Sequence, residues 1–310
     1  MKRIDYRKRI LLVLSLLFCG MGFMTQAQKN IELLSPDGKI KLSVTLGDEI
    51  TYAVAVNDNV LFDDVRLQLQ LRNETLGKKP KLSGQRRTSV DTEIKPVAPF
   101  KFSTVRNHYN QLLLHFKGGY SVEFRAFDDG IAHRFMTRKK GEIEVIHEHV
   151  DLSFAGDYLL HAQRDGFASF YEGPYEHLES RSFKPEDKTA LLPLLIDTRK
   201  GVKILLSEAD LNDYPCLFFR GRGEDNGLKS VLAPAALETK PDPNGRNIRV
   251  SKEADYIAKT AGTREFPWRW FVIAQNDGQL IESTMVCRLS PQNVIDDVSW
   301  IKPGLVMWDW

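Results

Sequence analysis

The sequence predicts an all-β protein that forms one large antiparallel β-sandwich. Residues 40–46 and 67–71 alternate apolar and polar side chains with period two, the pattern of a strand with one buried face. Turn signals rich in Gly, Pro, Asn and Asp separate such runs at spacings of about 8–12 residues, which is typical of sandwiches and barrels. No long stretch combines a helical period with capping residues. The hydrophobic content of 42% is that of an ordinary globular protein, so a single large core is expected.

The strands and turns follow one another closely along the chain. The clearest unit is a hairpin, because Gly118 and Gly119 supply a tight turn between two apolar runs. The polar and basic stretch 73–95 is expected to be a solvated loop or an edge region, and 180–190 and 220–228 are expected to be exposed loops. The expected elements are the turn 35–38, the strands 40–46 and 52–56, the turn 57–59, the strand 67–71, the strand 111–116, the turn 117–119, the strand 120–127 and the turn 128–130.

The first 27 residues have the pattern of a secretory signal peptide. A basic start precedes the apolar run 10–18, and Thr25-Gln26-Ala27 is a small-residue cleavage site. The alternative is an uncleaved anchor helix, although the apolar run is shorter than the roughly 20 residues that a membrane span needs. Secretion with a periplasmic location is therefore expected, with no stable membrane span after cleavage.

The charge balance excludes a nucleic-acid partner. Five of the 43 basic and one of the 41 acidic residues lie in residues 1–27, which leaves 38 basic and 40 acidic residues in the mature chain. The small net negative charge gives no basic surface for nucleic acid. Two cysteines remain, Cys216 and Cys287, and both a disulfide and two buried free thiols are compatible with their apolar contexts.

Two segments carry residue types that suit a binding site. His147 and His149 lie on one face of a predicted strand, so they form either a metal site, for which no third ligand is apparent, or a solvent-facing pair. Residues 170–177 place aromatic rings and carboxylates around a Gly-Pro turn, which suits a sugar site as well as an ordinary surface turn. Walker loops, GxGxxG motifs, GxSxG elbows and zinc-finger spacings are absent from the sequence.

Several stretches in order along the chain resemble glycoside hydrolase family 97, a family of secreted α-glucosidases and α-galactosidases. The resemblance covers residues 30–310. The matching stretches are Ser35-Pro36-Asp37-Gly38, Arg106-Asn107-His108-Tyr109-Asn110, Phe124-Arg125-Ala126-Phe127-Asp128-Asp129-Gly130, Ser207-Glu208-Ala209-Asp210-Leu211-Asn212-Asp213-Tyr214, Phe266-Pro267-Trp268-Arg269 and Ser299-Trp300-Ile301-Lys302-Pro303-Gly304.

The resemblance implies a particular domain organisation. Residues 1–27 are the signal peptide, residues 28–295 a galactose-mutarotase-like supersandwich, and residues 296–310 a linker with the first strand of a (β/α)8 catalytic barrel. The chain is accordingly expected to end as the barrel begins. In this family the two catalytic carboxyl groups lie on the barrel, so no catalytic residue is expected here and the chain alone is expected to be inactive.

The resemblance also implies a calcium ion at the sugar site, where an α-linked oligosaccharide binds. By motif the glutamate that this domain contributes is Glu172, with Glu176 as the competitor, and Trp308 is expected to line the sugar subsite. Because calcium takes six to eight oxygen ligands, one carboxylate on this chain is not expected to hold the ion tightly. The remaining ligands are expected on the barrel.

Two other functions stay open. In the first hypothesis the chain is a stand-alone periplasmic carbohydrate-binding or interaction domain. In the second it is a small enzyme that uses a histidine and a glutamate, such as His161 and Glu172, as an acid–base pair. The apolar C-terminal residues favour the barrel interpretation, because a single parallel strand needs neighbours. An exposed apolar patch on the barrel-facing side is then expected, and it would make the chain prone to aggregation or dimeric.

Overall fold

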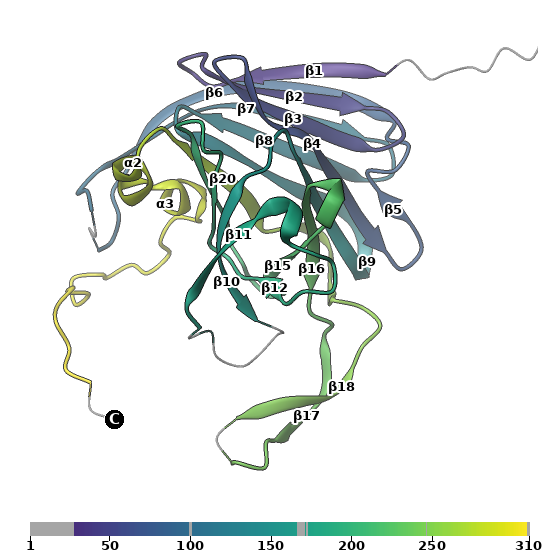
Figure 1. Ribbon diagram of the computed structural model, residues 1–310, viewed down its shortest axis with the longest axis vertical. Helices are drawn as coiled ribbons and strands as arrows, with labels where there is room; N and C mark the ends of the chain where they lie inside the picture. Colours follow the sequence, from purple (N-terminus) through teal and green to yellow (C-terminus); the bar gives the residue numbers. More distant parts are fainter. Residues whose placement is uncertain (1–27, 99–100, 166–170, 172, 246, 309–310) are drawn as a thin grey trace, which may run out of the picture.

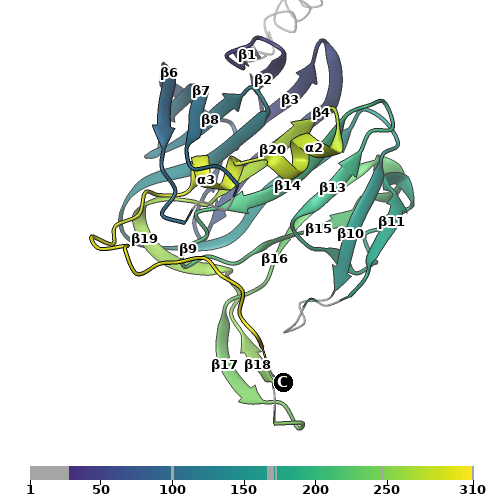
Figure 2. The ribbon, with the colours of Figure 1, turned by 90° about the vertical axis from the view of Figure 1, so that its left-hand side faces the viewer.

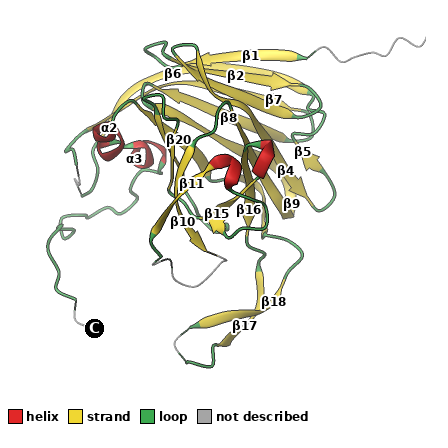
Figure 3. Ribbon diagram, viewed as in Figure 1, coloured by secondary structure: helices red, strands yellow, loops and turns green. Residues whose placement is uncertain are grey.

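The computed structural model describes residues 28–308 except 99–100, 166–170, 172 and 246 (Figure 1). These residues form an almost entirely β-structured domain in which every strand pairing is antiparallel, as the sequence predicts (Figure 3). The expected signal peptide, residues 1–27, lies outside the described residues. In the described part of the chain, no helix has the length and apolar character needed to cross a membrane.

One sheet system contains most of the strands. Its strands are β1 (Lys29–Leu34), β2 (Ile40–Leu46), β3 (Ile50–Val56), β4 (Asn59–Leu71), β5 (Thr75–Leu76), β6 (Leu82–Ile94), β7 (Val105–Phe116), β8 (Tyr120–Phe127), β9 (Gly130–Phe154), β10 (Leu159–Asp165), β11 (Tyr175–Glu179), β12 (Thr189–Ala190), β13 (Leu194–Asp197), β14 (Lys203–Ala209), β15 (Leu217–Gly221), β16 (Gly227–Leu232), β19 (Ala258–Glu265) and β20 (Trp268–Ala274). The other elements are the hairpin β17 (Ala236–Pro241) and β18 (Ile248–Glu253), the helices α2 (Asp277–Glu282) and α3 (Met285–Leu289), and the 3-10 turns η1 (Ser180–Ser182) and η2 (Gly223–Asp225).

Strand β9 joins two groups of strands. The first half of β9 pairs with β8 on one side and with β20 on the other, while its second half pairs with β4. One group therefore runs from β1 through β4 to β9, and the other runs from β6 through β8 to β9 and on through β20 and β14 (Figure 2).

The core lies between these two groups. Strand β2 alternates buried and half-buried residues along its whole length, so one of its faces is turned inward. Across the core, the ring of Tyr52 on β3 meets Phe124 on β8 edge-on at 5.7 Å, and Phe62 on β4 meets Phe271 on β20 at 5.3 Å. Residues from distant parts of the sequence thus pack face to face in one apolar cluster.

The hairpin predicted from its turn residues is confirmed, since β7 and β8 pair across residues 117–119. The stretch 73–95 contains β6, a long, mostly exposed strand whose partner among the described residues is β7. It is therefore an edge strand and not a loop. The expectation of exposed loops at 180–190 and 220–228 is wrong in part, because Phe183 and Leu228 are fully buried. The strands β15 and β16 form there, since Gly221 and Gly227 let the backbone approach neighbouring carbonyls closely.

The two short helices cover the outer face of β20 (Figure 1). Asn276 caps α2 by accepting a hydrogen bond from the backbone N–H of Gln279 at 3.1 Å. Met285 and Leu289 of α3 pack with Trp268 and Trp270 in a second apolar cluster. In the described residues the α-helices are therefore only six and five residues long, which explains why no helical period stands out in that part of the sequence.

The hairpin β17–β18 projects away from the rest of the domain (Figures 1 and 2). Every residue of both strands is exposed, including Leu237, Ile248 and Val250. A two-stranded hairpin with no packed face is at best marginally stable in water. Its exposed apolar side chains therefore suit a contact surface.

Acid should destabilise the fold through His133, which is buried in the core beside Tyr52. The Tyr52 hydroxyl lies 3.1 Å from His133 Nδ1, and burial lowers the pKa of His133 to about 3. In the unfolded chain His133 is protonated near pH 6.5, whereas in the folded chain it is protonated only at a much lower pH. The free energy of unfolding therefore falls as the pH falls between these two values. Between pH 6.5 and 4 we expect the wild type to lose about 3 kcal/mol more free energy of unfolding than His133→Gln. Urea unfolding across this pH range measures the difference, and equal losses in both proteins would contradict the assignment.

Candidate functional site

The predicted sugar segment, residues 170–177, follows β10 and includes the first three residues of β11. Glu172, the predicted calcium ligand, and Phe170 lie outside the described residues, so the pairing of His161 with Glu172 also stays a prediction. The Tyr171 ring meets Phe218 of β15 edge-on at 6.2 Å, and burial raises the pKa of its hydroxyl. This contact places the Tyr171 ring against β15.

Glu176, the competing candidate, is held by Arg164 of β10. Its Oε2 atom accepts hydrogen bonds from Arg164 Nε at 3.0 Å and from Arg164 Nη2 at 2.8 Å. The guanidinium also lies over the Phe183 ring, with 5.7 Å to the ring centroid, and 3.7 Å from Asp187. Glu176 is therefore engaged within its own sheet.

A buried charge network lies next to this segment. Arg269 on β20 is 0% exposed and donates to Glu148 on β9 at 3.0 and 2.7 Å and to Glu208 on β14. Glu208 Oε2 also accepts a hydrogen bond from the backbone N–H of Leu217, the first residue of β15, at 3.2 Å. Burial raises the pKa of Glu208, and Arg269 opposes that rise. One guanidinium thus ties four strands together beside the site segment.

Sequence reasoning does not identify this network, because its partners lie 121 and 61 residues apart. The signal that points to it is a single charged residue inside the otherwise apolar strand 268–274. Such a residue is buried only when it is paired. Glu208 and Arg269 both belong to stretches that resemble family 97. These two stretches therefore meet in the buried charge network.

A second group of those stretches meets at the turns 35–38 and 128–130. The backbone N–H of Asp37 donates to Asp128 Oδ1 at 2.8 Å, and His108 Nδ1 lies 3.4 Å from Asp128 Oδ2. Nearby, Arg125 lies over the ring of Tyr109 at 4.6 Å and over that of Trp268 at 4.4 Å. These contacts fix the geometry of the turns and strands at this end of the sheet.

His147 and His149 do not gain a third ligand. Their ring centroids are 4.5 Å apart, and His149 Nδ1 lies 3.7 Å from Asp151 Oδ2, which Arg66 already pairs. Both side chains are half-buried on the face of β9 opposite the buried Glu148, and burial lowers the pKa of His147 to about 4. Over the whole described range of the chain, no three His, Cys, Asp or Glu side chains are grouped to hold a metal ion.

The C-terminal residues form no strand in the described range. Residues 301–308 have no regular secondary structure, and the Trp308 side chain is 78% exposed. A strand needs neighbouring strands to pair with, and the expected parallel neighbours are those of the barrel. The two cysteines are free, and Cys216 is exposed rather than buried.

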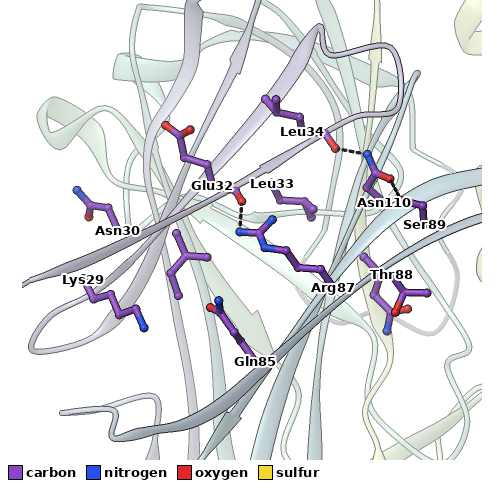
Figure 4. A pocket seen from close by; sticks show the side chains of 12 residues that line it. Lys29, Asn30, Glu32, Leu33, Leu34, Gln85, Arg87, Thr88, Ser89 and Asn110 are labelled. Atoms are coloured by element: carbon purple, nitrogen blue, oxygen red, sulfur yellow. Dashed lines mark hydrogen bonds between the residues drawn. The ribbon is translucent and has the colours of Figure 1, made fainter.

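A groove of about 910 Å³ lies between β1 and the pair β6–β7 (Figure 4). Arg87 donates to the Glu32 carbonyl at 2.7 Å and Asn110 to the Leu34 carbonyl at 2.9 Å, so these side chains satisfy the free edge of β1. None of the described residues that line the groove is aromatic. Because sugar sites use aromatic rings as platforms, the groove lacks a feature that the 170–177 segment has.

Comparisons with known proteins agree with this architecture. A family model described as Glycosyl-hydrolase 97 N-terminal matches residues 33–291. The chain is 36% identical to a retaining alpha-galactosidase of Bacteroides thetaiotaomicron, over 98% of this chain and 47% of the relative. It is 24% identical to a probable retaining alpha-galactosidase of Streptomyces bingchenggensis, over 89% of this chain and 39% of that relative. The chain thus spans less than half the length of both relatives.

Solved structures share the fold. A Glycoside Hydrolase Family 97 enzyme from Pseudoalteromonas sp. in complex with acarbose superimposes with a TM-score of 0.71 at 21% identity, over 88% of this chain and 40% of that one. A beta-arabinopyranosidase superimposes with a TM-score of 0.66 at 20% identity, over 83% of this chain and 42% of the other. At these identities the likeness shows the fold alone.

Proposed function

This chain belongs to glycoside hydrolase family 97, and from that premise we propose that it is the non-catalytic N-terminal domain of an α-glycosidase. The observation that carries the proposal is the extent of the match. The N-terminal family model covers residues 33–291, nearly all of the described β-structure, whereas the related α-galactosidase is more than twice as long as the matched part. We assign the finer fold as a galactose-mutarotase-like sandwich that supports a (β/α)8 barrel. The two carboxyl groups that glycoside hydrolysis uses then belong to the barrel.

The exposed apolar segments support a partner domain. The hairpin β17–β18 carries Ile248 at 69% exposure, and the residues after α3 expose Val294, Leu305 and Met307 almost completely. Exposed apolar surface of this kind marks interaction sites. We assign both segments to the contact with the catalytic barrel.

Glu172 is our candidate for the one calcium ligand that this domain contributes. The described residues alone do not fit a calcium site, because calcium takes six to eight oxygen ligands and they contain no metal-binding group. Tyr171 contacts Phe218 and Glu176 is held by Arg164, so a described residue on each side of Glu172 in the sequence is anchored to the domain. This anchoring supports a role in which Glu172 completes a site whose other ligands lie on the barrel, with Trp308 lining the sugar subsite. When bound, the ion would orient the sugar and offset negative charge there.

A chimera tests this function. The chain replaces the matching first half of the B. thetaiotaomicron α-galactosidase, and hydrolysis of an aryl α-galactoside is measured with and without calcium. We expect the chimera to be active and the chain alone to be inactive. Glu172→Gln should lower the calcium-dependent activity of the chimera at least about tenfold, as loss of a group around a metal does.

Glu176→Gln is the matched control, because it alters a carboxylate four residues away that is held by Arg164. We expect this variant to keep most of the activity. If Glu176→Gln abolishes the calcium response and Glu172→Gln does not, the ligand assignment is reversed. Hydrolysis by the chain alone, or a folded chimera without activity, would contradict the proposed supporting role.

A further inference from the structure

Two histidines face each other across neighbouring strands on the outer surface of the domain. His161 of β10 and His177 of β11 are direct partners in the antiparallel register. Their Nδ1 atoms are 2.7 Å apart, and the ring planes meet at 82°. The flanking Leu160 and Ala162 are buried, so both imidazoles point away from the core. The two nitrogens therefore converge at a surface position that solvent can reach.

The short separation shows that the two nitrogens aim at the same point. At 2.7 Å one imidazole donates its N–H to the other, so a single proton occupies the space between two lone pairs. A metal ion that prefers imidazole can bind both Nδ1 atoms at once, and the proton between them then moves to Nε2 of the ring that carried it. Neutral imidazole is the commonest metal-binding side chain.

We propose that His161 and His177 form a chelating site for a divalent transition metal with tetragonal geometry, Cu²⁺ in first place and Ni²⁺ in second. Two nitrogens about 2.0 Å from a metal are about 2.8 Å apart when they subtend 90°, and about 3.3 Å apart at the tetrahedral angle that zinc adopts. The observed 2.7 Å fits the first geometry closely. Zinc would require the two rings to move apart by about 0.6 Å.

The surroundings of the pair are compatible with a cation. Two charged side chains on neighbouring strands interact electrostatically with His161. Asp197 favours its protonated form, and Lys203 disfavours it. Lys203 is paired with Asp277, and Asp197 accepts a hydrogen bond from the backbone of Arg199 at 2.7 Å. Since the described residues supply no third His, Cys, Asp or Glu ligand, water fills the remaining coordination positions. This site does not depend on the proposed glycosidase role.

Titration of the chain, purified without a histidine tag, with Cu²⁺ and with Zn²⁺ tests the site. Calorimetry gives the affinity, and electron paramagnetic resonance of the copper form should show two equatorial nitrogens. We expect Cu²⁺ to bind more tightly than Zn²⁺. His161→Asn and His177→Asn should each weaken Cu²⁺ binding at least about tenfold, because even loss of an outer-sphere partner costs 10–100-fold.

His149→Asn is the matched control, since it removes one member of the other close histidine pair. We expect this variant to bind Cu²⁺ as the wild type does. Circular dichroism of each metal-free variant shows whether it is folded, which separates loss of the site from loss of the fold. Because His177 is exposed, His177→Asn should leave the core intact. Binding that survives both His161→Asn and His177→Asn, or that is lost in folded His149→Asn, would overturn the proposal.

Discussion

Replacing Arg269 with methionine should destabilise the protein by about 3–5 kcal/mol, because it leaves two buried carboxylates without their cation. Arg269 is fully buried, Glu148 is nearly so, and Glu208 is largely so. Burial disfavours a charged carboxylate, so without the guanidinium both glutamates must take up protons or draw water into the core. The loss should be larger at pH 8 than at pH 5, since protonation relieves the unpaired charge at low pH.

Urea unfolding of Arg269→Met measures this loss, and two further variants make the test specific. Arg106→Gln breaks the exposed pair with Asp91 and should leave the unfolding midpoint almost unchanged. The triple variant Arg269→Met, Glu148→Gln, Glu208→Gln removes all three charges and should regain part of the lost stability. If the single variant is as stable as the wild type, or if the triple variant is less stable than the single one, unpaired charge is not the cause.

The hairpin of β7 and β8 could be predicted from the sequence because its determinants are local. Gly118 and Gly119 set the turn, and period-two alternation sets which face is buried. Strand β9 could not be predicted as one continuous element of 25 residues, because it exchanges partners along its length. Its partners on β4 and β20 lie far away in the sequence, and no local pattern encodes such a pairing.

The same distinction holds for the candidate site. The aromatic and acidic composition of residues 170–177 marks the segment in the sequence, because the residues are neighbours. The contacts of its described residues come from other strands, namely Phe218 of β15 for Tyr171 and Arg164 of β10 for Glu176. The pairing of His161 with His177 belongs to this class too, since strand register alone brings the two rings together. A residue type can thus suggest a site, but its partners depend on the register of the sheet.

Gly221→Ala should destabilise the protein by about 3 kcal/mol and loosen the connection that carries Glu172. A Cβ atom at Gly221 would lie 1.8 Å from the carbonyl oxygen of Phe183, so the backbone of one segment would have to move. That carbonyl also accepts a hydrogen bond from the N–H of Gly223 at 2.9 Å, which the movement would weaken. Because Arg164 lies over the Phe183 ring and holds Glu176, a displacement of Phe183 should reach the site connection.

Gly84→Ala is the control for this change, because the nearest atom to its Cβ position is a side-chain carbon of His115 at 3.8 Å, an ordinary contact. We expect Gly84→Ala to leave stability almost unchanged, and Gly221→Ala to speed hydrogen exchange of the amides in residues 173–183. Faster exchange there, with unchanged exchange in β2 and β3, would link the packing of Gly221 to the position of the site. Uniformly faster exchange throughout the domain would instead mean that Gly221 supports global stability only, and a stable Gly221→Ala would show that Phe183 moves without cost.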